Sequence, residues 1–389
     1  MAESAEPLEG DSVRGQPGAY GPRYERPTHS PVLVGDELTD GALRSVTSTP
    51  TNGECRGDDR QLRATQCVTD RAVIDELMSA VPEDLPVLRE MQIKNRTATA
   101  APRQLRPGES LYDADDIRPD LRSQLNALLE AHEDWATFAR EVVRTVDAAG
   151  HLVWIIGGPV RDVVQGRPVS EVNDLDLAGS ATPEVFLELL ERVLIRLGLA
   201  GMEIGCSPGS LVCWVRDTEN MKRLLEYKPL AEFGFHFPAC GNDFGRDVAT
   251  RDFSWNALFY DPQRGQLIDP LGTGVADLLA IPRKFRVAHG TDKPVELLNI
   301  AIRAIKFIHR ERSRDVPVEI DPVREWLAQI SPELVVQLSE PARNDLGLRA
   351  RKQLQDVPTQ DAWRIADELH PVTRQVLEAV EPFWPEQGR

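Results

Sequence analysis

Residues 153–177 read VWIIGGPVRDVVQGRPVSEVNDLDL, and the predicted fold and function depend on this stretch. It begins with an apolar run that is typical of a short buried strand and breaks at Gly157 and Gly158. It ends in a second predicted strand that carries Asp174 and Asp176. Because side chains alternate along a strand, the two carboxylates share one face and the two leucines share the other. The leucines therefore indicate the core, and the aspartates point to a cleft or to solvent.

The glycines and the aspartates together predict a site for a phosphate and a metal ion. Two close carboxylates repel each other unless a cation lies between them, and oxygen ligands of this kind suit Mg²⁺ together with substrate phosphates. Glycines let the backbone approach a ligand, and the N-terminus of the next helix favours anions. Pro159 suits the first position of that helix, and Arg161 lies in its first turn. The alternative is an ordinary solvated strand with two acids.

The composition limits the class of protein. The 389 residues are enough for two or three domains, and a net charge of -17 argues against an extensive RNA-binding face. No apolar run approaches the roughly 20 residues that span a bilayer, and the first residues lack the pattern of a signal peptide. The five cysteines form no CxxC pair, so a reducing cytoplasm is expected. They are Cys55, Cys67, Cys206, Cys213 and Cys240.

The chain divides into three predicted parts. Residues 1–118 form a largely disordered extension rich in proline, glycine and polar residues, with one possible short helix at 71–90. Residues 119–290 form a domain of mixed helices and strands, and residues 291–389 are helical.

Within the ordered parts, the periodicity predicts several elements. These are a helix from Leu121 to Gly150, strands at 152–156 and 173–177, and a helix after the N-cap Thr182 that ends at Gly198. Further strands are expected at 211–215 and 224–230, a strand-rich sheet edge at 251–272, and a helix at 294–312.

Three segments carry a resemblance to a known family. Residues 157–184, GGPVRDVVQGRPVSEVNDLDLAGSATPE, resemble the head-domain signature of class II tRNA nucleotidyltransferases and bacterial poly(A) polymerases. Residues 247–280, DVATRDFSWNALFYDPQRGQLIDPLGTGVADLLA, are similar to the family's second conserved block. Residues 303–310, RAIKFIHR, resemble the end of its neck-helix motif. The resemblance covers about residues 150–310 in the order of the family.

The resemblance implies a mixed-sheet α/β (α+β) nucleotidyltransferase head of the polymerase-β type, followed by a helical neck and body. It implies that Asp174 and Asp176 are catalytic and bind Mg²⁺ or Mn²⁺. It also implies a nucleotide-binding set, comprising Gly157, Gly158, Arg161, Arg251, Asp252, Asn256 and Arg303. Glu226 is a candidate third carboxylate if its strand lies beside the acidic pair. Asp252 and Asn256 could instead cap a turn and satisfy buried backbone groups.

The sequence departs from the family pattern at four positions. Pro159 replaces a small residue with a hydroxyl or thiol, and Thr250 replaces a basic residue. Leu297 and Ile300 replace the aspartate and arginine that recognise the incoming base. Apolar side chains cannot form hydrogen bonds with a base edge, so we do not predict that the helix at residues 294–312 chooses between CTP and ATP. This helix could instead be mostly core.

Three functions follow from these patterns. The first is metal-dependent transfer of a nucleotide from an NTP, ATP or CTP, to an RNA 3′ end, with tRNA as the expected acceptor and pyrophosphate as the product. The second is transfer to a hydroxyl of a small molecule or protein. The third is a nucleotide-binding regulatory module with weakened catalysis. Base preference, acceptor, protein partners and oligomeric state are left open by the sequence, and no membrane association is expected.

Overall fold

The computed structural model describes residues 110–130, 136–172, 175–207, 210–219, 223–232, 239–241, 243–290 and 293–383. Asp174 lies outside the described residues, and so do the predicted extension up to residue 109 and the possible helix at residues 71–90.

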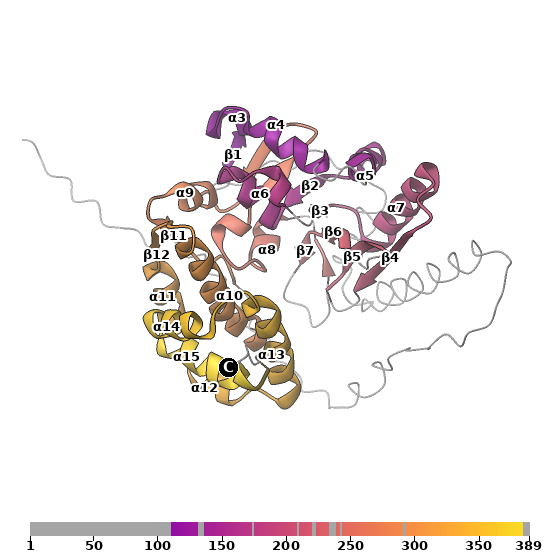
Figure 1. The fold of residues 1–389 in the computed structure, drawn as a ribbon. Coiled ribbons are helices and arrows are strands. Elements are labelled where there is room, and N and C mark those ends of the chain that lie inside the picture. The colour runs from indigo at the N-terminus through magenta and orange to yellow at the C-terminus, as the bar shows by residue number, and fades with distance from the viewer. Residues whose placement is uncertain are drawn as a thin grey trace, which may run out of the picture. The chain divides into compact units, whose positions relative to one another are not determined.

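Eight strands form one mixed sheet in the described part of the chain (Figure 1). Strands β3 and β6 run parallel, and the other neighbouring strands run antiparallel. This arrangement confirms the predicted mixed sheet, including the strands expected near residues 211–215 and 224–230. Across the sheet the order is β1 (Ser110–Asp113), β10 (Gln266–Asp269), β9 (Phe259–Asp261), β2 (Val153–Ile156), β3 (Leu175–Gly179), β6 (Arg223–Pro229), β5 (Val212–Asp217) and β4 (Met202–Ser207).

The first described element begins at Ser110, before residue 119, where we expected the domain to start. Strand β1 forms the sheet edge beside β10 and is followed by helices α3 (Ala114–Ile117) and α4 (Leu121–Asn126). The prediction of one helix from Leu121 to Gly150 is wrong, because α4 ends at Asn126 and the chain continues as the 3₁₀ helix η1 (Ala127–Glu130). The apolar spacing of this region indicated burial and not a continuous helix, because its leucines are buried.

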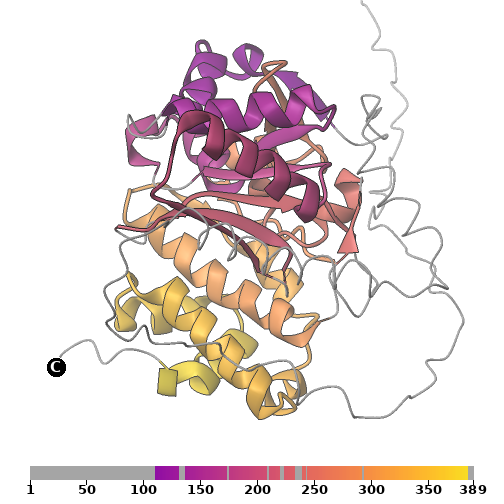
Figure 2. The same ribbon diagram turned by 90° about the vertical axis from the view of Figure 1, so that its right-hand side faces the viewer.

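One face of the sheet is covered by helices α5 (Ala136–Ala148) and α7 (Pro183–Leu197), and Figure 2 shows α7 in magenta along this face. Helix α7 begins at the N-cap Thr182 and ends at Gly198, as predicted. Phe186 of α7 stacks on Tyr227 of β6 with 3.8 Å between the ring centroids. Fully burying an aromatic or large aliphatic side chain contributes about 1.5–3 kcal/mol each, so this face forms the main core of the sheet.

The opposite face is covered only in part by the described residues. Below β2 and β9, helix α8 (Phe244–Val248) packs Phe244 against Trp154 and Phe259 with edge-to-face rings. Leu175 and Leu177 point into the main core, which leaves Asp176 on this second face. Short elements nearby are α6 (Gly157–Val164), η2 (Val169–Glu171), β7 (Ala231–Glu232), β8 (Ala239–Cys240) and η3 (Ser254–Asn256).

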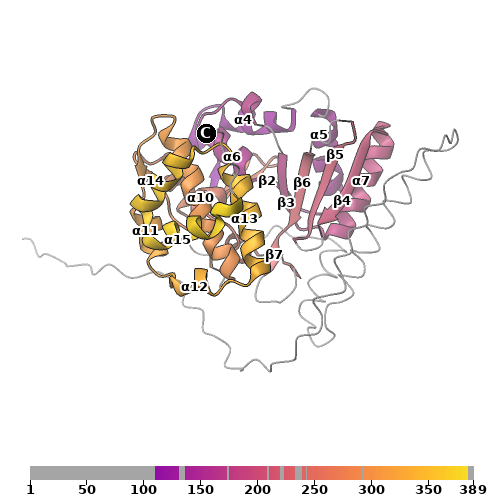
Figure 3. The ribbon, with the colours of Figure 1, turned by 60° about the horizontal axis from the view of Figure 1, so that its bottom comes forward.

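The C-terminal part is helical, as predicted (Figure 3). Helix α10 (Pro294–Arg312) is its central element and packs against α13, α14 and α15. The other elements are α9 (Gly274–Leu279), β11 (Arg283–Lys284), β12 (Val318–Glu319), α11 (Asp321–Leu327), α12 (Glu333–Val336), α13 (Glu340–Leu354), α14 (Thr359–Leu369), α15 (Pro371–Val380) and η4 (Glu381–Phe383). Strand β11 pairs with β12, so this pairing joins the segment before α10 to the segment after it.

No helix in the described ranges is both long and apolar enough to cross a membrane. The described cysteines, Cys206, Cys213 and Cys240, are free thiols.

Candidate active site

The glycine turn between β2 and α6 lies directly against Asp176. Gly157 has φ of +69°, a backbone conformation that L side chains rarely adopt, and a Cβ there would lie 3.3 Å from the Oδ2 atom of Asp176. Helix α6 begins at Gly157, two residues earlier than predicted, so Pro159 is its third residue. Backbone N–H groups in the first turn have no partner within the helix, and proline is tolerated there for that reason. The turn therefore brings a helix N-terminus to a carboxylate.

A second carboxylate lies beside Asp176. Strands β3 and β6 are parallel neighbours, and their register pairs Asp176 with Glu226. Opposite residues on adjacent strands share a face, so both side chains lie on the face that α5 and α7 do not cover. Glu226 accepts a hydrogen bond from Arg223. Glu226 was a candidate third carboxylate if its strand lay beside the strand of the acidic pair, and its strand does lie beside that of Asp176.

These carboxylates fit the chemistry of a divalent cation. Carboxylate oxygens are the ligands that Mg²⁺ prefers, and Mg²⁺ usually binds to one or two of them together with phosphates. The described residues contain no group of three or more metal-ligating side chains. Asp174, for which the sequence predicts a position on the same face, lies outside the described residues. Asp176 and Glu226 thus form the described part of a candidate metal site.

Four predicted nucleotide-binding residues form one chain of hydrogen bonds. The Arg161 guanidinium donates to Asn256 Oδ1 at 2.7 Å, and the Asn256 amide donates to both carboxylate oxygens of Asp252 at 2.9 and 3.0 Å. Asp252 also accepts from Arg303 of α10. Burial would raise the pKa of Asp252, but Arg303 and the hydrogen bonds from Asn256 and Phe253 hold it below its ordinary value. The chain connects α6, η3 and α10 through a buried anion.

Cations surround one aromatic ring at the end of this chain. Phe307 of α10 has four cationic groups between 5.0 and 5.8 Å from its ring centroid, and they come from Arg161, Arg303, Lys306 and Arg310. Burial and the three arginines lower the pKa of Lys306 to about 8. Since like charges crowd here, we expect the cluster to stabilise a bound anion.

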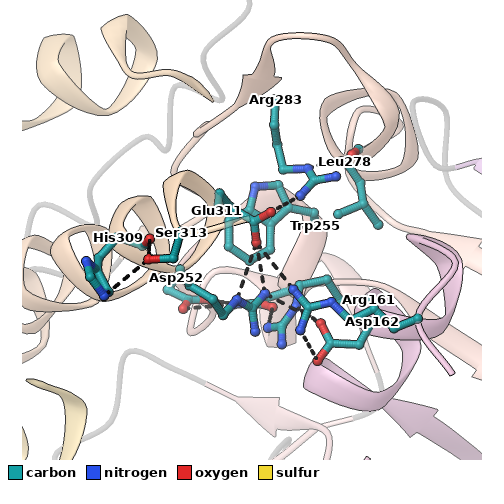
Figure 4. A network of polar contacts seen from close by, with 12 residues as sticks. Arg161, Asp162, Asp252, Trp255, Leu278, Arg283, His309, Glu311 and Ser313 are labelled. Atoms are coloured by element: carbon teal, nitrogen blue, oxygen red, sulfur yellow. Dashed lines mark hydrogen bonds and ion pairs between the residues drawn. The ribbon is translucent and has the colours of Figure 1, made fainter. Parts of the chain in front are cut away.

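Carboxylates neutralise part of this cluster (Figure 4). Asp162 accepts from Arg161 at 2.7 Å, and Glu311, which is 2% exposed, pairs with Arg283 and Arg310. Figure 4 shows Arg161 and Asp162 close to Glu311 of α10. Helical spacing could have identified Lys306 and Arg310 as site residues, because they lie three and seven positions after Arg303 on the same side of α10.

Arg251 does not join this network among the described residues. Its guanidinium donates twice to Asp247 Oδ2, at 3.0 and 2.8 Å, and Asp247 is fully buried. Lys228 of β6, which the sequence analysis did not identify, lies 3.4 Å from the hydroxyl of Thr250. Burial lowers the pKa of Lys228, while Asp247 acts in the opposite direction. A cation from β6 therefore lies next to position 250, where the family pattern has a basic residue.

The two apolar substitutions in the neck helix are part of the packing. Ile300 is 3% exposed in the main core, and Leu297 packs against that core. Glu296, which directly precedes Leu297, pairs with Arg349 of α13 at 3.0 Å. In this part of α10, the positions that should read a base stabilise the helical bundle.

Comparisons with known proteins agree with the sequence resemblance. Residues 153–281 match the family model of the Poly A polymerase head domain. The CCA-adding enzyme of Bacillus pumilus is 25% identical over 265 residues, which cover 64% of this chain and 62% of that protein. Poly(A) polymerase I of Haemophilus influenzae is 28% identical over 202 residues, which cover 49% of this chain and 42% of that protein.

Among solved structures, the Thermotoga maritima CCA-adding enzyme complexed with tRNA is similar, with a TM-score of 0.48 and 20% identity. The match covers 72% of this chain and 57% of that one. The chain thus spans less than two thirds of the length of these relatives.

Proposed function

We propose that this chain, whose residues 153–281 match the family model of the Poly A polymerase head domain, is a nucleotidyltransferase that transfers NMP from an NTP to an RNA 3′ end. The observation that supports it best is the position of Asp176, which lies beside Gly157 at the N-terminus of α6 and opposite Glu226 on the neighbouring strand. Carboxylates for a cation and N–H groups for a phosphate then lie on the same side of the sheet.

Each part of the site has a proposed role. Asp176, Glu226 and the predicted Asp174 would hold Mg²⁺ or Mn²⁺, which when bound supplies charge neutralisation for in-line attack on the α-phosphate. The N–H groups after Gly157 and the Arg161 guanidinium would bind the triphosphate. In such reactions, positioning and electrostatic stabilisation supply most of the rate.

We further propose that the network of Asn256, Asp252 and Arg303 holds Arg161 in place. A guanidinium that already donates to a fixed oxygen loses little freedom when a phosphate binds to its remaining N–H groups. Lys306 and Arg310 would then bind the outer phosphates. Arg251, which pairs with the buried Asp247, would support the pocket without contacting the nucleotide.

The division of labour in the chain follows from these roles. We assign the nucleotidyltransferase head to residues 119–290, with β1 as an added edge strand, and the helical neck and body to residues 291–389. Relatives named as CCA-adding enzymes and a poly(A) polymerase support an RNA 3′ end, tRNA first, as the acceptor and ATP or CTP as the donor.

The test is nucleotide transfer from each of the four labelled NTPs, with and without total tRNA, by the wild-type chain and by Asp176→Asn and Glu226→Gln variants. Both substitutions should lower the rate on the order of 10³-fold without changing thermal unfolding. Asp147→Asn, an exposed carboxylate on α5, is the matched control and should keep the wild-type rate. A wild-type rate in the Asp176→Asn variant would refute the assignment.

The same assay separates the other functions. If the label appears in a small molecule or a protein when no RNA is present, that molecule is the acceptor and the RNA acceptor is refuted. Binding of NTP without release of pyrophosphate by the wild-type chain would favour a regulatory module.

A further inference from the structure

A row of four residues crosses the face of the sheet that carries the candidate active site. The register pairs Asp176 of β3 with Glu226 of β6, Glu226 with Trp214 of β5, and Trp214 with Gly205 of β4. Directly opposite residues share a face, so the indole lies on the same face as both carboxylates. Trp214 is two strands from Asp176, about 10 Å at the usual strand spacing.

The indole of Trp214 lies flat over the neighbouring strand. A Cβ at Gly205 would lie 2.4 to 2.9 Å from three carbon atoms of the ring, so only glycine leaves room for it. Cys213 and Val215, the neighbours of Trp214 in β5, point into the core on the other side, whereas Trp214 is partly exposed. The ring therefore has one side on Gly205 and is held by the sheet.

Two arginine guanidinium groups lie over this ring. The guanidinium carbon of Arg216 is 4.9 Å from the centroid of Trp214, and that of Arg223 is 6.0 Å away. Their side chains are 31% and 48% exposed, and each pairs with one glutamate, Glu203 and Glu226 respectively. In each pair the carboxylate leaves some guanidinium N–H groups for another acceptor, since a guanidinium has five.

We infer that Trp214 is a stacking platform for a base near the 3′ end of a single-stranded RNA acceptor, with Arg216 and Arg223 binding its phosphates. An aromatic face that stacks a base, with cations beside it for the backbone, is how proteins bind single strands without reading sequence. The inference rests on the proposed function, and it specifies an acceptor that presents unpaired nucleotides. It also reconciles RNA binding with the net charge of -17, because only a local contact is needed.

The row explains how the acceptor would be oriented. With a base held on Trp214, the following nucleotide would be within reach of β6 and β3, where Glu226 and Asp176 lie. Arg223 pairs with Glu226 and lies over the Trp214 ring, 6.0 Å from its centroid, so a phosphate bound there would lie between the stacked base and the carboxylates. Trp214 is thus a positioning residue for the acceptor.

The test uses the full chain and compares Trp214→Ala with Trp214→Phe. The matched control is Trp363→Ala, because Trp363 in α14 also carries an arginine, Arg374, 5.5 Å from its ring. Binding of a labelled single-stranded RNA is measured by fluorescence anisotropy, and KM for RNA and for NTP are measured separately. Trp214→Ala should weaken RNA binding and raise KM for RNA about ten-fold, the loss expected for one stacked base. KM for NTP should not change.

Trp214→Phe should recover most of the RNA affinity, since a flat ring is kept, and Trp363→Ala should match the wild type. Arg216→Gln should reduce the slope of RNA affinity against salt concentration by the amount expected for about one phosphate contact. Wild-type RNA affinity in the Trp214→Ala variant, with unchanged thermal unfolding, would overturn the inference. If the wild type transferred no nucleotide at all, the proposed function would fail, and the anisotropy series would still decide whether Trp214 binds RNA.

Discussion

The pair formed by Asp252 and Arg303 should stabilise the contact between η3 and α10 more strongly than an ordinary ion pair. Asp252 is 7% exposed and accepts hydrogen bonds from Asn256, from the Phe253 backbone and from Arg303. Hydrogen bonds to a buried charged group contribute about 1.5–3 kcal/mol each, and removal of one partner of a buried pair costs about 3–5 kcal/mol. Asp252→Asn should therefore lose a large share of a total stability of about 5–15 kcal/mol.

A double-mutant cycle measures this coupling directly. Urea unfolding of the wild type, Asp252→Asn, Arg303→Gln and the double variant should give an interaction free energy of about 1.5–3 kcal/mol. The matched control is the pair Glu130 and Arg140, whose side chains are 55% and 56% exposed with atoms 2.9 Å apart. Exposed pairs contribute about 0–1 kcal/mol. If both cycles gave the same small coupling, Asp252 would not hold Arg303 as the structure indicates.

Three further outcomes follow from the geometry. Because the pKa of Lys306 is lowered to about 8, its charge is lost as pH rises from 7 to 9. The affinity for NTP, measured by calorimetry, should therefore fall over this range. The Lys306→Arg variant should show a weaker dependence of NTP affinity on pH. In the folded state, the pKa of Asp252 lies below its ordinary value of 3.8. Its contribution to stability is therefore complete above that value and is lost as pH falls through the folded pKa. When acid unfolding is followed by circular dichroism, the Asp252→Asn variant should lose less stability than the wild type below about pH 4. Gly157→Ala and Gly198→Ala should each lose about 1 kcal/mol of stability, because both glycines have positive φ, but only Gly157→Ala should lower nucleotide transfer, since a Cβ there contacts Asp176.

Sequence patterns predicted the helices and strands in which buried residues recur at a regular spacing. Thr182 and Gly198 bound α7 as expected, and Leu175 and Leu177 face the core while Asp176 does not. The residues between 121 and 150 were harder, because an apolar spacing that fits a helix also fits the 3₁₀ turn in which Leu128 is buried.

The pairing of Asp176 with Glu226 could not be predicted, because it depends on strand order and not on local spacing. Asp176 meets Glu226 only because β6, which is fifty residues further along the chain, inserts beside β3. Arg251 differs, because it lies four positions after the buried Asp247, and this local spacing could have pointed to their ion pair. The motif residues thus indicated a candidate site, and the sheet register decided that Asp176 meets Glu226.

In the proposed function the two sides of α10 have different roles, and this difference would constrain how the chain selects its nucleotide. Arg303, Lys306 and Arg310 surround Phe307 beside Arg161, so this side can bind phosphates that every NTP shares. Ile300, at the position that the resemblance assigns to base recognition, is buried, and its apolar side chain has no donor or acceptor for a base edge. Any preference among the four NTPs must then come from residues outside this helix position. Replacing Ile300 by arginine would introduce a charge into the core, so we expect it to destabilise the bundle and not to create base selectivity.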